Sequence, residues 1–213
     1  MLLFRAVLLL LSITVAAVFA WRIRAPRGSF FTRHLALIWL AWAVELVGLI
    51  TSQLGIRNAI MYNLYALVEF LVLMSLVRLL RPGWATILLG IGAIGIGAVL
   101  LAMWRLGPTR QLALEGILVL GLLCSAVFLR LLLALAGDSQ TKLGSTPAFW
   151  LFIGALAYFG GIIPIVGAWR FLGELDKELS KTLYWIVIIL AIIRYACATV
   201  ACALEYERTQ VAT

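Results

Sequence analysis

The stretch Ala59–Leu80, AIMYNLYALVEFLVLMSLVRLL, is apolar over a length that can cross a lipid bilayer. A spanning helix needs about 20 mostly apolar residues at roughly 1.5 Å per residue, so this stretch predicts a transmembrane helix. Its first half carries the polar side chains Tyr62, Asn63, Tyr65 and Glu69. Glu69 lies near the middle of the stretch, where a carboxylate costs about 2.5–3.5 kcal/mol, and more if it faces lipid alone. We therefore expect Glu69 to face the protein interior and to have a partner.

The composition places the whole chain in the same class. Of its 213 residues, 65% are hydrophobic and 12% are charged, whereas soluble domains carry about 25% charged residues. We expect an all-α integral membrane protein whose residues 1–213 form one membrane domain. The net charge of +8 does not indicate nucleic-acid binding, because the arginines cluster at the ends of apolar runs, as they do at membrane flanks. We expect no nucleic-acid partner.

Seven apolar runs predict a bundle of seven transmembrane helices. The predicted spans lie at about 2–21, 35–54, 59–80, 85–103, 112–136, 146–169 and 182–204. The end of the first run imitates a signal-peptide cleavage site, but cleavage would leave several arginines on the outer face, so we expect an uncleaved span. Gly160–Pro164 in the sixth run predicts either a broken helix or an ordinary proline kink.

The distribution of lysine and arginine predicts the orientation. With the N-terminus outside, nine of these residues fall on the cytoplasmic side and seven on the outer side. Four arginines between the first two runs carry most of the weight, because basic residues near the ends of spans favour the cytoplasmic side: Arg22, Arg24, Arg27 and Arg33. The expected topology is N-out and C-in.

Three ionisable residues, Glu45, Glu69 and Arg194, each fall near the centre of a predicted span. The shared depth predicts that Arg194 contacts one of the two glutamates. Tyr62 and Tyr65 precede Glu69 at helical spacing, so all three lie on one face. Two interpretations stay open. One is a structural clasp between Arg194 and one glutamate, with the other protonated. The other is a site for a ligand, ion or proton, because ionisable groups at the midplane often mark such sites.

Small residues in the seventh run indicate which way Arg194 faces. Small side chains let a neighbouring helix approach closely, so the stripe that contains Arg194 is predicted to be buried. Its members are Ala191, Arg194, Cys197, Ala198 and Ala201.

No motif in the chain predicts catalysis or a cofactor. Gly90–Gly95 matches a dinucleotide-binding pattern, but it lies in an apolar run without a preceding strand, so we interpret Gly90, Ala93 and Gly97 as a helix-packing face. His34 is the only histidine, which argues against bis-histidine haem and the common zinc sites. The three cysteines lie inside apolar runs and are interpreted as buried thiols. We expect no catalytic residue, no metal and no cofactor.

Two short motifs resemble an uncharacterised family of small seven-span bacterial membrane proteins. The first is Tyr62-Asn63-Leu64-Tyr65 with Glu69-Phe70, and the second is FWLFIGALAYFGG at 149–161. The resemblance covers about a third of the chain. It implies the seven-span fold, a location in the bacterial plasma (inner) membrane and a motif role for Glu69. It implies no activity.

These observations predict a multi-pass membrane protein with a polar pocket near the midplane, acting as a receptor-like sensor or a small transporter for a small ligand, ion or lipid. Two alternatives remain. A structural partner subunit should expose a small-residue face, for which the fourth run is the best candidate. A lipid-modifying enzyme would depend on Glu115 or Asp138 near an interface, and we favour a protein that is not an enzyme. Expected partners are membrane lipids, the ligand, and a second copy or another membrane protein. The predicted ligand-binding residues are Glu69, Arg194, Glu45, Tyr65, Tyr62 and Asn63.

Overall fold

The computed structural model describes the backbone of residues 2–23, 28–106, 112–138, 142–172 and 177–211. Within these residues the chain is helical and has no strand, as the composition predicts. Two short 3₁₀ helices, η1 (Pro82–Trp84) and η2 (Leu143–Ser145), lie in connections. The described residues form seven α-helices: α1 (Leu2–Arg22), α2 (Ser29–Gln53), α3 (Ala59–Leu80), α4 (Ala85–Leu106), α5 (Leu114–Asp138), α6 (Pro147–Leu172) and α7 (Lys177–Val211).

The outer surface of the bundle is rich in exposed aliphatic side chains. Leu89, Ile94 and Leu133 are each at least 60% exposed, which suits a lipid environment better than water. Among the described residues, the six helices from α2 to α7 are long and apolar enough to cross a membrane. α1 contributes a shorter apolar stretch, Ala6–Arg22. This is the composition of a multi-pass membrane protein.

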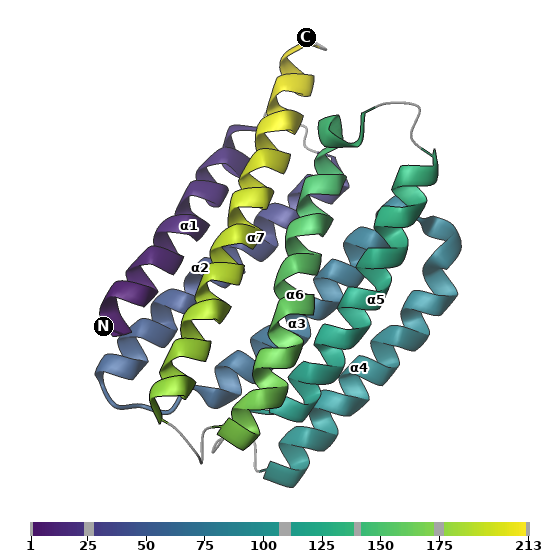
Figure 1. Cartoon of the computed structure of the whole chain (residues 1–213). Coiled ribbons are helices and arrows are strands. Elements are labelled where there is room, and N and C mark those ends of the chain that lie inside the picture. Colours follow the sequence, from purple (N-terminus) through teal and green to yellow (C-terminus); the bar gives the residue numbers. More distant parts are fainter. Residues whose placement is uncertain (1, 24–27, 107–111, 139–141, 173–176, 212–213) are drawn as a thin grey trace.

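The helices pack side by side along a common direction (Figure 1). α7 packs between α1 and α6, and α5 packs between α6 and α4. α2 and α3 lie behind α6 and α7 in Figure 1, and α2 packs on α1 while α3 packs on α2, α4 and α5. The two termini lie at opposite ends of the bundle. The polar residues of α2, α3 and α7 are therefore brought toward a shared interior.

The observed helix bounds correct some of the predicted spans. α3 has the predicted bounds, but α2 begins at Ser29, six residues before the predicted span, and α7 extends beyond both predicted ends. The polar ends of these helices are helical although they are not apolar, so hydropathy alone misses them. α6 is continuous through Pro164, so the broken-helix alternative is wrong. Arg24, Arg27 and Arg110 lie outside the described residues.

Glycines set the close approaches between helices. A Cβ at Gly95 on α4 would lie 2.5 Å from the ring of Phe70 on α3, and a Cβ at Gly116 on α5 would lie 2.8 Å from the backbone of Val99. In contrast, Gly90, Ala93 and Gly97 are exposed, and a Cβ at either glycine would meet nothing within 4 Å. The predicted packing face of the fourth run therefore packs against nothing within the described part of the chain.

Candidate functional site

A buried ion pair lies at the centre of the bundle. Arg194 Nη2 on α7 lies 2.6 Å from Glu69 Oε1 on α3, and the two side chains are only 11% and 6% exposed. The Tyr65 hydroxyl, one turn before Glu69, donates a hydrogen bond to the same oxygen at 2.8 Å. Glu69 is ten residues from the start of α3 and eleven from its end, and Arg194 is 17 residues from each end of α7. The predicted contact between Arg194 and a glutamate is confirmed, with Glu69 as the partner.

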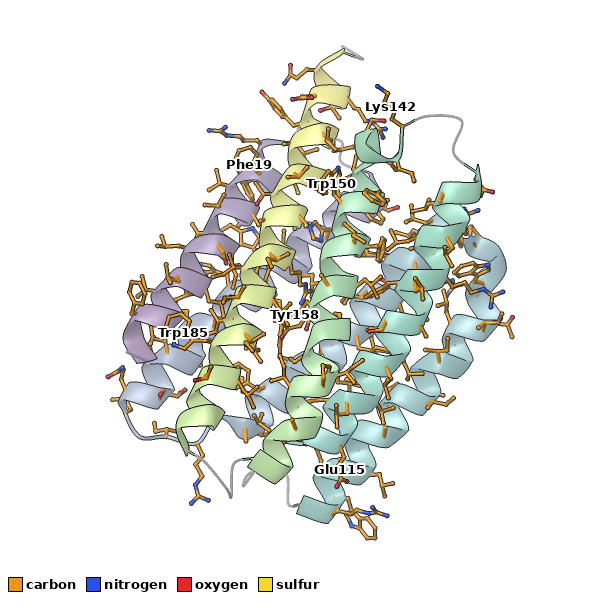
Figure 2. The ribbon with its side chains drawn as sticks, in the orientation of Figure 1. Phe19, Glu115, Lys142, Trp150, Tyr158 and Trp185 are labelled. Carbon is orange, nitrogen blue, oxygen red and sulfur yellow. The ribbon has the colours of Figure 1, made fainter. Side chains whose placement is uncertain are left out.

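Aromatic rings surround the guanidinium group. The Arg194 Cζ atom lies 5.2 Å from the ring centroid of Tyr158, 5.4 Å from that of Phe159 and 5.5 Å from that of Tyr195. Ring faces attract a cation at this range, and more strongly where water is excluded. Figure 2 places Tyr158 midway along the bundle, between Lys142 near one end and Glu115 near the other. The charge of Arg194 is therefore stabilised far from both ends of the bundle.

Small residues on α7 allow Arg194 to face the interior. Ala191, Ala198 and Ala201 are at most 8% exposed, which confirms the predicted buried stripe. Gly154 on α6 faces the same stripe, and a Cβ there would lie 2.5 Å from Cys197 Cβ. Since no side chain separates the helices at this point, α6 and α7 approach closely and the Arg194 side chain extends beside them toward α3.

A second polar pair lies between α2 and α3. The Tyr62 hydroxyl donates a hydrogen bond to Glu45 Oε2 at 3.3 Å. The Tyr62 hydroxyl also lies where a side chain at Gly48 would be, so the tyrosine crosses the face of α2 only because position 48 is glycine. This places two of the predicted ligand-binding residues against each other.

The turn between α2 and α3 fixes this pairing. Gly55 has φ +69°, a conformation that glycine adopts without strain. Its N–H donates to the Ser52 carbonyl at 3.2 Å, and the Ile56 N–H donates to the Thr51 carbonyl at 2.9 Å, which is a Schellman motif. The Asn58 side-chain amide donates to the Gly48 carbonyl at 3.3 Å. The helices therefore reverse direction within a few residues.

Glu45 does not lie at the centre of its helix, where the apolar run predicted it. Because α2 begins at Ser29, Glu45 lies sixteen residues after its start and only eight before its end. Glu45 is therefore displaced from the centre toward the turn that joins α2 to α3. Measured from this turn, Glu45 lies eight residues from the end of α2 and Glu69 lies ten residues from the start of α3, so the two carboxyl groups keep nearly the predicted common depth. Tyr62, three residues after the start of α3, lies nearer the turn.

Asn63 occupies a different face of α3. Its Oδ1 accepts a hydrogen bond from the Ala113 N–H at 2.9 Å, and the residue is 1% exposed. The first N–H groups of a helix have no partner within the helix, and polar side chains commonly supply one. Asn63 thus joins α3 to the start of α5, which is a structural contact that the sequence did not predict.

The sequence analysis missed His34 as a site residue. His34 is 5% exposed on α2, and neither ring nitrogen has a hydrogen-bond partner among the described residues. Together with Arg194 and Tyr195 it lines a cavity between α2, α3, α6 and α7. The predicted second span began after His34 and so excluded it. The spacing of His34 with Ile38 and Ala41, at i, i+4 and i+7, is the signal that places it on the buried face.

The arrangement is suited to holding protons or a small polar molecule. It combines two carboxyl groups, one guanidinium group, several tyrosine hydroxyls and one imidazole, from α2, α3, α6 and α7. No group of three or more His, Cys, Asp or Glu side chains suited to a metal ion occurs in the described part of the chain. Asp138, one of the acids that the enzyme alternative requires, forms a salt bridge with Arg81.

Comparison with protein-family models, with curated proteins and with solved structures finds no match to this chain. The resemblance to the uncharacterised seven-span family stays a prediction from short motifs.

Proposed function

We propose that the chain is a seven-span protein of the bacterial inner membrane whose central polar cluster binds a small ligand, ion or lipid. It acts as a receptor-like sensor or as a small transporter. The observation that carries this proposal is the ion pair between Glu69 and Arg194 at the middle of α3 and α7. Ionisable groups at such depth are costly in a membrane and are typical of substrate, ion or proton pathways.

The second carboxyl group supports a site in preference to a clasp. A structural clasp for Arg194 needs one carboxylate, and Glu69 supplies it. Glu45 and Tyr62 are additional: Glu45 lies at nearly the same distance from the α2–α3 turn as Glu69, and Tyr62 lies nearer the turn. A buried ion pair is also weak evidence for stability, because desolvation of the two charges offsets much of their attraction. A binding role would explain the presence of Glu45 and Tyr62, which the ion pair between Glu69 and Arg194 does not need for its own stability.

The proposed topology is N-out and C-in, with α1 as the first of seven spans. Two arginines are held at the end of the bundle that would face the cytoplasm: the Arg208 guanidinium donates to the Ser145 carbonyl at 2.9 Å, and Arg81 pairs with Asp138. A reporter fused after residue 213 and active only in the cytoplasm is expected to be active. A periplasmic reporter at the same position is expected to be inactive, and strong activity from it would contradict the topology.

Glu69→Gln tests the binding role. The amide keeps the size of the side chain and its hydrogen-bonding capacity but removes the charge and the titration. The measurement is the thermal unfolding midpoint of the purified protein across the neutral pH range and with a panel of small acids, amines, sugars and inorganic ions. A ligand that binds the native state raises this midpoint. The wild-type protein is expected to respond to at least one condition, and a folded Glu69→Gln variant is expected to lose that response.

Glu115→Gln is the matched control for this experiment. Glu115 lies in the first turn of α5 and is exposed, so the control makes the same chemical change near an interface. It is expected to retain the wild-type response. If folded Glu69→Gln and Tyr65→Phe variants both keep every wild-type response, the central cluster is not a binding site.

The second candidate function is a partner subunit of a membrane complex, which the exposed face of α4 favours. Gly90, Ala93 and Gly97 share this face, and small residues at a helix surface let another transmembrane helix approach closely. α4 is also the least buried of the six candidate spans. A wild-type protein without any ligand or pH response, together with intact Glu69→Gln and Tyr65→Phe variants, would favour this function.

A further inference from the structure

His34 is a buried polar side chain whose hydrogen-bonding groups need a partner. Its two ring nitrogens are buried and lack one among the described residues. A buried polar group without a hydrogen bond is costly, because it loses its bonds to water and gains none in return, so nearly all such groups in native proteins are paired with protein or with ordered water. The residue thus indicates a bound species beside it.

The cavity beside His34 has the size of one water molecule. Its volume is about 20 Å³, measured as the space open to the centre of a water-sized sphere. A single water needs roughly 10–15 Å³ on this measure and two to four polar partners. Three of the ten lining residues are polar, namely His34, Arg194 and Tyr195, and the others are Leu, Ile and Ala. The cavity therefore offers both the volume and the partners that one water requires.

The charges around the cavity restrict what else it holds. Arg194 is the charged side chain in its lining, and no carboxylate lines it. A metal cation would lie beside the Arg194 guanidinium with no carboxylate in the lining to balance its charge. An organic ligand is larger than the cavity. Arg194 is itself neutralised by Glu69 Oε1, at 2.6 Å from Nη2, which disfavours a further anion. Water is the species that remains.

We propose that this cavity binds one water molecule that hydrogen-bonds to both His34 and Arg194. His34 lies five residues after the start of α2 and Glu45 sixteen, which is roughly 7.5 Å and 24 Å along the helix. The bound water therefore adds a polar group roughly 16 Å from Glu45 along α2, a distance of a little under half the length of that helix.

His34 is the only histidine in the chain, so its ring nitrogens give unambiguous magnetic-resonance signals. Solid-state spectra of histidine-labelled full-length protein in lipid bilayers are expected to show magnetisation transfer between water protons and the His34 ring. A well-folded wild-type protein without this transfer would overturn the bound water.

Filling the cavity with a larger side chain also tests for the bound water, because the unfolding midpoint should fall if water is displaced and rise if the cavity is empty. Ala155 on α6 lines the cavity, and Ala155→Val adds two methyl groups to it. A bound water predicts a lower unfolding midpoint, since its displacement leaves His34 unpaired. A cavity without water predicts a higher midpoint, because added methyl groups then fill unoccupied space. In a His34→Leu background, Ala155→Val is expected to lose its destabilising effect. Ala198→Val, on the α7 side of the cavity, serves if Ala155→Val does not fold.

Discussion

Arg194→Leu is expected to remove most of the folded protein. Arg194 and Glu69 are an ion pair with side chains only 11% and 6% exposed, so the substitution leaves the Glu69 carboxylate buried without its cation. Removal of one member of a buried pair typically costs about 3–5 kcal/mol, which is a large share of the stability of an ordinary protein. The measurement is the yield of monodisperse protein and its midpoint of unfolding in mixed detergent micelles.

The identity of the partner can be tested with two double variants. Arg194→Leu with Glu69→Leu removes both charges, so part of the lost stability should return. Arg194→Leu with Glu45→Leu is the matched control and should not recover, because Glu45 is hydrogen-bonded to Tyr62. Recovery with Glu45→Leu but not with Glu69→Leu would contradict the observed pairing.

Gly154→Val is expected to have the second largest effect, although position 154 carries no polar group. A Cβ at this position would lie 2.5 Å from Cys197 Cβ and 3.2 Å from the Arg194 carbonyl oxygen. Neither atom belongs to the flexible end of a side chain, so α6 and α7 would have to separate. Overpacking in a core costs about 1–3 kcal/mol, and we expect the upper part of this range. The midpoint of unfolding in mixed micelles measures it.

The control for this prediction is Gly97→Val on α4. A Cβ at Gly97 would meet nothing within 4 Å, so this variant makes the same chemical change without a steric conflict. It is expected to unfold near the wild-type midpoint. Equal midpoints for Gly154→Val and Gly97→Val would show that α6 and α7 are not in close contact at Gly154.

The fold class and much of the polar centre follow from the sequence alone. Long apolar runs predict helices because a membrane span must satisfy its own backbone hydrogen bonds, and the bounds of α3 were predicted correctly. The contact between Arg194 and a glutamate also follows, since charges in the middle of apolar runs need a partner of opposite sign. The buried stripe of α7 was visible as a row of small residues.

Hydropathy could not locate the ends of the helices, and two errors arose from this. α2 starts at Ser29, within a segment that is too polar to be recognised as part of a span. The earlier start displaces Glu45 from the centre and places His34 inside the helix. Both consequences depend on where the helix begins. The first turns of α2 are polar, so the length of the apolar run does not indicate this starting point.

The choice of partners was decided only by the tertiary structure. Arg194 meets Glu69 and not Glu45 because α7 is held close to α6 at Gly154, while the short turn at Gly55 directs Tyr62 to Glu45. Asn63 bonds to the backbone of Ala113 for a similar reason, 50 residues along the chain. Sequence periodicity identifies the inward face of each helix. The neighbour that this face meets depends on how closely helices distant in sequence approach one another, and glycine contacts across the bundle determine that.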